Sequence, residues 1–282
     1  MSLTAAFSDE LIGLAERICA VRQPARVRGL HLPERLARDA KESEFCALEL
    51  DDGSIGLSYL LLGDTPQRMR AAAPGAAIAG RSALEVARGL RGEDPVGRVL
   101  GLAAINAICQ GVLLAHPEVL DWTSDPLGLL DPRPGDRIGM VGLFGGLAAR
   151  IVAAGAHLVV VELDPALAGP RDGYEVTLDR GALGACDKVL STTTLALNGT
   201  LDEVLDACRG AGSIALVGPG GGFLPDPLFA RGVTLLGGSA VVDRDAFVAA
   251  TARGEPWGGS VRKYCIRRET YPGAEALLSA AG

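Results

Sequence analysis

The chain has 282 residues, which is long enough for two compact domains of ordinary size. Hydrophobic residues make up 48% and charged residues 22%, a balance that excludes a mainly disordered chain, while 4% aromatic residues leave a largely aliphatic core. The formal net charge of -7, without a basic stripe, argues against a nucleic-acid partner.

The first part of the chain, residues 1–120, has the pattern of a small α+β domain. Its N-terminus lacks a basic region followed by an apolar core, so we expect no secretion signal and a cytoplasmic protein. Residues 8–20 have apolar side chains at helical spacing behind Ser8, which we expect to cap this helix. Strands are predicted at 27–32, 45–50 and 55–62, the last two joined by a hairpin turn at 51–54, and helices at 82–91 and 96–115.

Within the helix predicted at 96–115, residues 99–115 are apolar enough to raise the question of a membrane span. This segment is short for that purpose and contains Asn106 and Gln110, so we expect a buried core helix and no membrane partner. The two amides are four residues apart and therefore share one helix face. Because an unpaired buried amide is costly, they are expected either to bond within the protein or to face a cleft between the domains and bind a ligand.

Residues 121–133 are dense in proline and glycine and are predicted to link the first domain to a second one, residues 134–282. In that second part, short apolar segments at 138–141, 158–162, 188–191, 214–217 and 233–236 alternate with mostly helical stretches. This alternation predicts a mainly parallel sheet with right-handed crossovers. Ligands of such sheets lie beyond the carboxyl ends of the strands, here the segments 142–146, 162–164, 191–194, 218–222 and 237–239.

The glycines after the first of these strands are the strongest local sign of a small-molecule site. Gly142, Gly145 and Gly146 allow a sharp turn and a close approach to a ligand, and the helix expected to start near Leu147 favours an anion. Glu162 lies 20 residues beyond Gly142, a separation typical of a carboxylate that binds ribose. Met140 stands where a dinucleotide motif has its first glycine, so close helix–strand packing remains an alternative role for these glycines.

A second polar segment follows the predicted strand at 188–191. Thr200 and Glu203 have the spacing of a capping box, which predicts that Thr200 starts a helix at 201–209. Asn198 and Gly199 fit turn chemistry, and a capped helix start would also present its amides to a ligand.

The residues that could ligate a metal are dispersed. The six cysteines include no C-x-x-C pair and the three histidines no H-x-x-x-H pair, so the cysteines are expected to be reduced core residues. No local nucleophile–base motif occurs either, and enzymatic activity stays open.

Several motifs, in this order along the chain, resemble the putative heavy-metal chelation family over nearly the whole length: residues 101–107, 139–145, 161–165, 191–200, 216–219 and 237–243. The resemblance implies an enolase-N-terminal-like α+β domain followed by a Rossmann-like α/β domain. It also implies a ligand site between the two domains, formed by Asn106, Gly142, Phe144, Gly145, Asn198 and Thr200.

Three functional hypotheses follow. The first is a protein that binds, and as an enzyme would modify, a small anionic or metal-chelating molecule between the domains. The alternatives are a nucleotide-cofactor enzyme that uses NAD(P) or S-adenosylmethionine, and a non-catalytic carrier of a heavy metal; a homo-oligomer stays open in each case. The candidate ligand-binding residues are Asn106, Gly142, Phe144, Gly145, Gly146, Glu162, Asp164, Thr192, Asn198, Gly199, Thr200 and Gly218.

Overall fold

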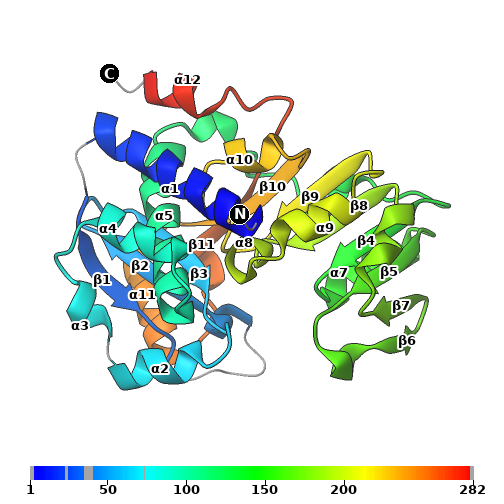
Figure 1. Cartoon of the computed structure of the whole chain (residues 1–282), viewed down its shortest axis with the longest axis horizontal. Helices are drawn as coiled ribbons and strands as arrows, with labels where there is room; N and C mark the ends of the chain where they lie inside the picture. The colour runs from blue at the N-terminus through cyan, green and yellow to red at the C-terminus, as the bar shows by residue number, and fades with distance from the viewer. Residues whose placement is uncertain (1–2, 23–24, 35–40, 73, 280–282) are drawn as a thin grey trace.

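The computed structural model describes residues 3–22, 25–34, 41–72 and 74–279. It contains two separate sheets (Figure 1). The small sheet is antiparallel and has the order β1 (Val27–His31), β2 (Phe45–Leu50), β3 (Ile55–Tyr59). The large sheet has eight strands in the order β11-β10-β9-β8-β4-β5-β7-β6. The predicted fold class is thereby confirmed.

The small sheet lies between two helices that come from opposite halves of the chain. On one face α5 (Pro95–Leu113) packs so closely that a Cβ added to Gly56 would lie 2.1 Å from the carbonyl oxygen of Ala103. On the other face Phe247 of α11 (Arg244–Arg253) packs with Trp257 against Ile55 and other sheet residues. Side chains alternate between the faces of a strand, so neighbouring residues of β3 contact different helices: Gly56 faces α5 and Ile55 faces α11.

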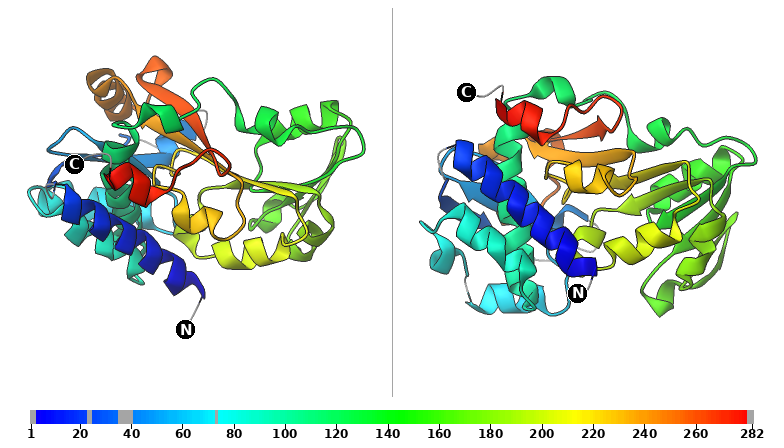
Figure 2. Two further views of the ribbon diagram at one scale, coloured as in Figure 1. Left: turned by 90° about the horizontal axis from the view of Figure 1, so that it is seen from above. Right: turned by 45° about the horizontal axis from the view of Figure 1, so that its top comes forward.

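Helix α5 is the centre of the first half, as predicted. By length and composition it could cross a membrane, but 78% of its apolar window is buried within the protein. Helices α1 (Leu3–Val21), α4 (Ala83–Ala87), α2 (Thr65–Ala72) and α3 (Pro74–Ile78) lie around it and the small sheet (Figure 2). The predicted cap at Ser8 is wrong, because α1 already includes Leu3 and Ser8 is buried inside the helix.

All five predicted strands of the second half are present and parallel: β4 (Arg137–Val141), β5 (His157–Val161), β8 (Lys188–Thr192), β9 (Ser213–Val217) and β10 (Leu235–Val241). Three further strands were not predicted: β7 (Tyr174–Thr177), the edge strand β6 (Gly169–Arg171) and β11 (Val261–Arg267). Residues 237–239 lie inside β10, paired with β11, so their expected position beyond a strand end is wrong.

Besides α11, the α-helices described in the second half are α6 (Pro126–Leu130), α7 (Gly145–Ala153), α8 (Leu195–Asn198), α9 (Leu201–Ala207), α10 (Asp226–Phe229) and α12 (Ala274–Ser279). Helix α6 falls within the predicted linker, and its Leu127 and Leu130 are buried against the large sheet. Asp121 also exchanges two backbone hydrogen bonds with Cys265 of β11. The segment 121–133 is therefore packed structure, and a division into independent domains at this point stays a prediction.

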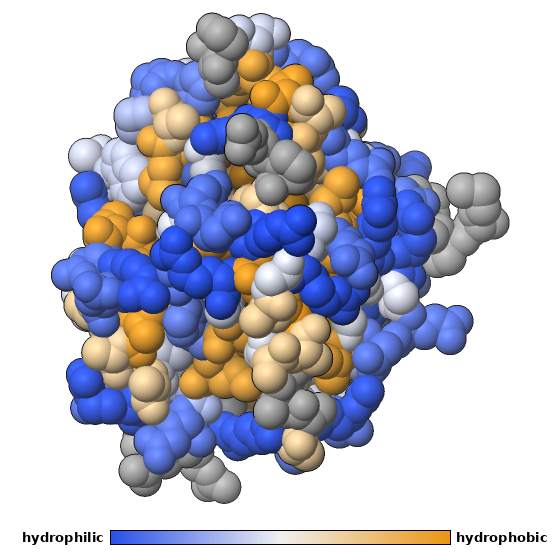
Figure 3. Space-filling model, turned by 90° about the vertical axis from the view of Figure 1, so that its left-hand side faces the viewer, coloured by the Kyte–Doolittle hydropathy of each residue, from blue (hydrophilic) through white to orange (hydrophobic). Residues whose placement is uncertain are grey.

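One hydrophobic core joins the two halves. It includes Leu11 and Val99 from the first half together with Leu224 and Leu236 from the second. On the face shown in Figure 3, the hydrophobic residues lie in several patches separated by hydrophilic ones, which is ordinary for a water-exposed surface.

Candidate functional site

The strand order of the large sheet changes direction between β4 and β8. From β4 the chain continues to β5 on one side, whereas β8 and β9 lie on the other side. Ligands of open α/β sheets bind at such a switch point, beyond the carboxyl ends of the strands. We call the residues at and after the ends of these four strands the carboxyl edge: 142–146, 162–164, 192–194 and 218–222.

The structure brings Gly142 and Thr192 together at this switch point. Gly142 has φ 84°, a conformation that favours glycine, and its N–H donates to the carbonyl of Val161. A Cβ on Gly142 would lie 3.4 Å from Cγ2 of Thr192. The predicted turn after β4 is therefore present and is packed against the end of β8.

Helix α7 begins at Gly145, two residues earlier than predicted, with an uncapped start. Phe144 occupies the N-cap position without a side-chain capping bond. Gly145 and Gly146 are exposed, and a Cβ on either would meet no atom within 4 Å. Close helix–strand packing, the alternative role considered for these glycines, is therefore wrong for Gly145 and Gly146. Because N–H groups of a first helical turn lack helical partners, those of Gly145 and Gly146 can donate to an anion.

Glu162 stabilises the turn that precedes α7. One carboxylate oxygen accepts the N–H of Leu143 at 2.5 Å and the other accepts that of Leu163 at 3.1 Å. Its proposed contact with ribose stays a prediction. Asp164 accepts the N–H of Ala166 at 2.9 Å and so caps a short 3-10 helix, Pro165–Leu167.

Two of the threonines at the end of β8 are hydrogen-bonded to each other, and a third packs against the next loop. Oγ1 of Thr192 donates to Oγ1 of Thr194 at 3.0 Å and accepts the N–H of Thr194 at 3.2 Å. Thr193 is buried beneath Gly218, where an added Cβ would lie 2.5 Å from Oγ1 of Thr193. Gly218 therefore allows the loop after β9 to approach β8 closely.

The predicted capping box at Thr200 is wrong. Thr200 does occupy the N-cap position of α9, but its hydroxyl donates to Oδ1 of Asn198 at 2.7 Å and makes no capping bond. Glu203 forms an ion pair with Arg180 instead. Asn198 and Gly199, the latter with φ 84°, form the turn that the sequence indicated.

Asn106 and Gln110 attach the loop 218–222 to the first half of the protein. Nδ2 of Asn106 donates to the carbonyls of Leu57, at 2.7 Å, and Gly220, at 2.9 Å. Nε2 of Gln110 lies 3.2 Å from the carbonyl oxygen of Gly222 and 2.8 Å from the hydroxyl of Tyr264. Both side chains are fully buried, and their NH2 groups have the internal partners foreseen as one alternative, whereas Oδ1 of Asn106 and Oε1 of Gln110 have no hydrogen-bond partner among the described residues. A ligand contact by Asn106 stays a prediction.

Two residues near the carboxyl edge were missed by the sequence analysis. Tyr59 ends β3, and its pKa is raised by burial and by the charges of Glu44 and Glu162, so the small sheet reaches the region of Glu162. Arg98 of α5 donates through Nε and Nη2 to the carbonyl of Leu197 in α8. A single charged side chain within an apolar helix is a signal that could have drawn attention to Arg98.

The described side chains do not fit a directly bound heavy-metal ion. Within the described ranges, no three His, Cys, Asp or Glu side chains gather closely enough to hold one. Burial raises the pKa of four thiols to about 12, which keeps them protonated and makes them poor metal ligands: Cys46, Cys109, Cys208 and Cys265.

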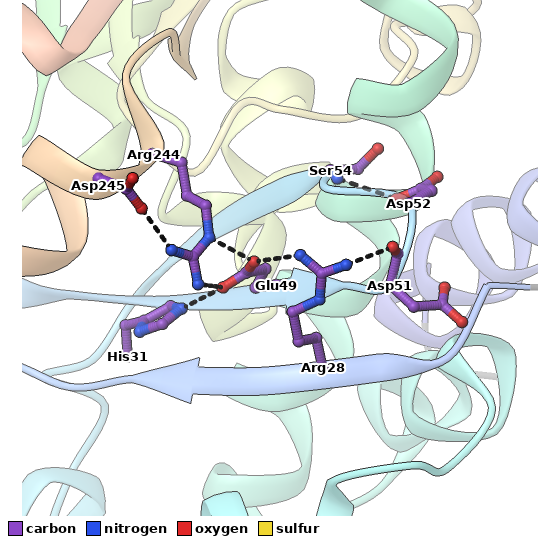
Figure 4. A network of polar contacts seen from close by, with 8 residues as sticks. All are labelled: Arg28, His31, Glu49, Asp51, Asp52, Ser54, Arg244 and Asp245. Atoms are coloured by element: carbon purple, nitrogen blue, oxygen red, sulfur yellow. Dashed lines mark hydrogen bonds and ion pairs between the residues drawn. The ribbon is translucent and has the colours of Figure 1, made fainter.

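A separate polar network surrounds Glu49, whose side chain is 1% exposed (Figure 4). Its carboxylate accepts from Arg28 at 3.1 Å, pairs with Nε2 of His31 at 2.8 Å and accepts from Arg244 at 2.7 and 3.1 Å. Burial acts to raise the pKa of Glu49, but the bonds with Arg244, His31 and Arg28 prevail and lower it to about 2. The network fastens α11 to β1 and β2, and we assign it to stability.

A pocket of about 210 Å³ lies at the other end of the large sheet, beside Ser213 and Leu235 at the amino ends of β9 and β10. Arg267 lines it, but this guanidinium already pairs with Asp121 and Glu269. Its charge is therefore balanced, and the carboxyl edge remains the stronger candidate.

Two family models match the chain, and both carry the description "Putative heavy-metal chelation": DUF4213 over residues 43–109 and DUF364 over residues 125–268. No curated protein is significantly similar to the chain.

Two solved structures of DUF364-family proteins of unknown function share the fold. The protein from Desulfitobacterium hafniense DCB-2 is 22% identical with a TM-score of 0.73, over 92% of this chain and 98% of that one. The protein from Pyrococcus horikoshii is 23% identical with a TM-score of 0.70, over 91% of this chain and 99% of that one. At these identities the likeness shows the fold alone.

Proposed function

We propose, from the premise that the chain belongs to the putative heavy-metal chelation family DUF364, that it binds a small anionic, metal-chelating molecule at the carboxyl edge. In this proposal any heavy metal is held by the bound molecule and not by protein side chains. Whether the molecule is also chemically modified is left to experiment.

The observation that carries the proposal is the open, uncapped start of α7. Gly145 and Gly146 are exposed in the first turn of α7, and a Cβ on either would meet no described atom within 4 Å; they lie next to the turn of Gly142 and the end of β8. The positive end of a helix dipole favours negative charge at this place. In a chain of net charge -7, such local donors are what an anionic ligand needs.

The metal-carrier alternative is less well supported, because the cysteine thiols are held protonated and no cluster of ligands is formed by the described residues. The nucleotide alternative depended on Glu162, whose two oxygens both accept backbone N–H groups of the neighbouring turn. Binding of a metal-chelating anion requires neither a cluster of metal ligands in the protein nor a free carboxylate at Glu162.

Native mass spectrometry of freshly purified protein, with metal analysis of the same sample, is the first test. We expect a bound small molecule, and any metal should leave with it when the protein is unfolded. Retention of metal by the protein after the small molecule has been removed would contradict the proposal.

Gly145→Asp gives a sharper test with citrate, with and without an equivalent of Zn²⁺, as the probe. The new carboxylate should stabilise the start of α7 by about 0.3–1 kcal/mol, because it complements the helix dipole. It should also weaken citrate binding at least tenfold by repulsion, whereas Gly145→Ala should bind like the wild type. Calorimetric titration and thermal melting measure both effects, and unchanged binding by Gly145→Asp would exclude this site.

A further inference from the structure

The two halves of the protein meet beside the carboxyl edge where α5 approaches α8. Arg98, in the first turns of α5, reaches across this seam and donates to the carbonyl of Leu197 through Nε at 3.0 Å and Nη2 at 2.5 Å. Helix α8 directly follows the threonine segment at the end of β8. A cation from the first half is therefore fixed close to the switch point of the large sheet.

The charge of Arg98 has no counter-charge among the described residues. The side chain is half-buried, and burial alone lowers its pKa. Arg231 provides the contrast: it is fixed in a similar interior position by Glu10 and Asp202, and these contacts raise its pKa. A partly desolvated guanidinium without an anion is unfavourable, and a bound anion would relieve this cost.

We propose that Arg98 binds an oxyanion group of the ligand, a carboxylate or a phosphate, at the seam between α5 and α8. This inference rests on the proposed function and adds the chemical group that is recognised. Nε and one N–H of Nη2 are engaged by Leu197, which orients the planar guanidinium and leaves Nη1 to donate. Asn198, next to Leu197, directs its Oδ1 to Thr200, so its Nδ2 remains a second donor in the same turn.

The test compares the wild type with Arg98→Gln and Arg98→Lys by calorimetric titration. Citrate and pyrophosphate are the two probes, and they distinguish a carboxylate from a phosphate ligand. We expect Arg98→Gln to weaken the better probe at least tenfold. Arg98→Lys should weaken it less, because the charge remains while the planar fork is lost.

Arg22→Gln is the matched control. Arg22 is also half-buried and donates to a backbone carbonyl, that of Gly111 at 2.6 Å, but at the opposite end of α5. The Arg22→Gln variant should bind citrate and pyrophosphate like the wild type. An equal loss in Arg22→Gln and Arg98→Gln would overturn the inference, because the effect would then be structural; melting curves of all variants are recorded alongside.

The outcomes separate this inference from the proposed function. If Gly145→Asp loses binding while Arg98→Gln binds normally, the inference on Arg98 is wrong and the site at α7 stands. If the wild type binds neither probe, with or without Zn²⁺, both are wrong.

Discussion

Glu49 shows how one buried carboxylate can hold together elements from both ends of the chain. Its partners are Arg28 and His31 of β1 and Arg244 of α11, so its loss leaves two arginines close together without the buried carboxylate that both of them bind. We expect Glu49→Gln to lower the free energy of unfolding by about 3 kcal/mol, the scale for breaking a buried ion pair. Asp245→Asn, which removes an 89% exposed partner of Arg244, should cost under about 1 kcal/mol. Urea unfolding of the two variants measures the difference.

The lowered pKa of Glu49 also predicts how the stability of the protein depends on acidic pH. The pKa of Glu49 is about 2 in the folded protein against an ordinary value of 4.5, so its contribution is fully present above pH 4.5. It is lost as the pH falls from there towards 2, because protonation favours the unfolded chain. The stability gap between wild type and Glu49→Gln should therefore narrow over this range. A gap that stays constant down to pH 2.5 would assign the effect to packing and not to charge.

Asn106 is expected to act mainly on stability. Asn106→Ala removes two buried hydrogen bonds and leaves the carbonyls of Leu57 and Gly220 unpaired, which should cost about 2–3 kcal/mol. Asn198→Ala, at a half-exposed turn, should cost about 1 kcal/mol or less. Thermal melting ranks the two, and citrate titration of Asn106→Ala provides the decisive control. Lost citrate binding with unchanged melting would show that Asn106 belongs to the ligand site.

At the scale of helices, α11 has an N-terminal side-chain cap, whereas α9, for which a cap was predicted, has none. Asp243 accepts the N–H of Ala246 at 3.1 Å and caps α11, whereas Thr200 makes no capping bond at α9. We expect Asp243→Ala to lower the free energy of unfolding by about 1 kcal/mol and Thr200→Ala by a smaller amount. Equal losses in chemical denaturation would show that the hydroxyl of Thr200 contributes as much to stability as a true cap.

Most of the strands that could be predicted are buried on both faces, with β1 as an exception. β4 and its parallel neighbours are short apolar runs bounded by turns, a pattern that is visible without tertiary information. β11 was not predicted because its second and third residues, Arg262 and Lys263, are charged and exposed. The glycines of β10 resembled a loop, yet a Cβ on Gly238 would lie 2.5 Å from the ring of Tyr264. Glycine is needed there by a contact that lies outside the local sequence.

The loops of the candidate site were predictable because parallel strands bring their carboxyl ends to one edge. The partners of individual side chains were not predictable in the same way. Asn106 and Glu162 bond to backbone groups, and such acceptors and donors occur at every position of a sequence. Spacing alone therefore indicated polar residues at the right edge without showing what each one contacts.

At the scale of the whole molecule, the two sheets are joined by shared packing. Helix α11 follows β10 of the large sheet but covers the small sheet, and Arg244 at its start is bound to Glu49 of β2. The main core also contains residues from both halves. The chain is therefore expected to unfold in one cooperative transition, even though its sheets are separate.

Calorimetry of the full chain should accordingly give a single transition, with equal calorimetric and van't Hoff enthalpies. Phe247→Ala, at the contact between α11 and the small sheet, should lower the free energy of unfolding by about 3–5 kcal/mol, because the side chain is fully buried. The transition should remain single. A fragment of residues 134–282 would expose Phe247 and Trp257, which pack against the small sheet, and it should melt without a sharp transition. Two resolved transitions in the full chain, with Phe247→Ala moving only one of them, would instead establish two independently folding domains.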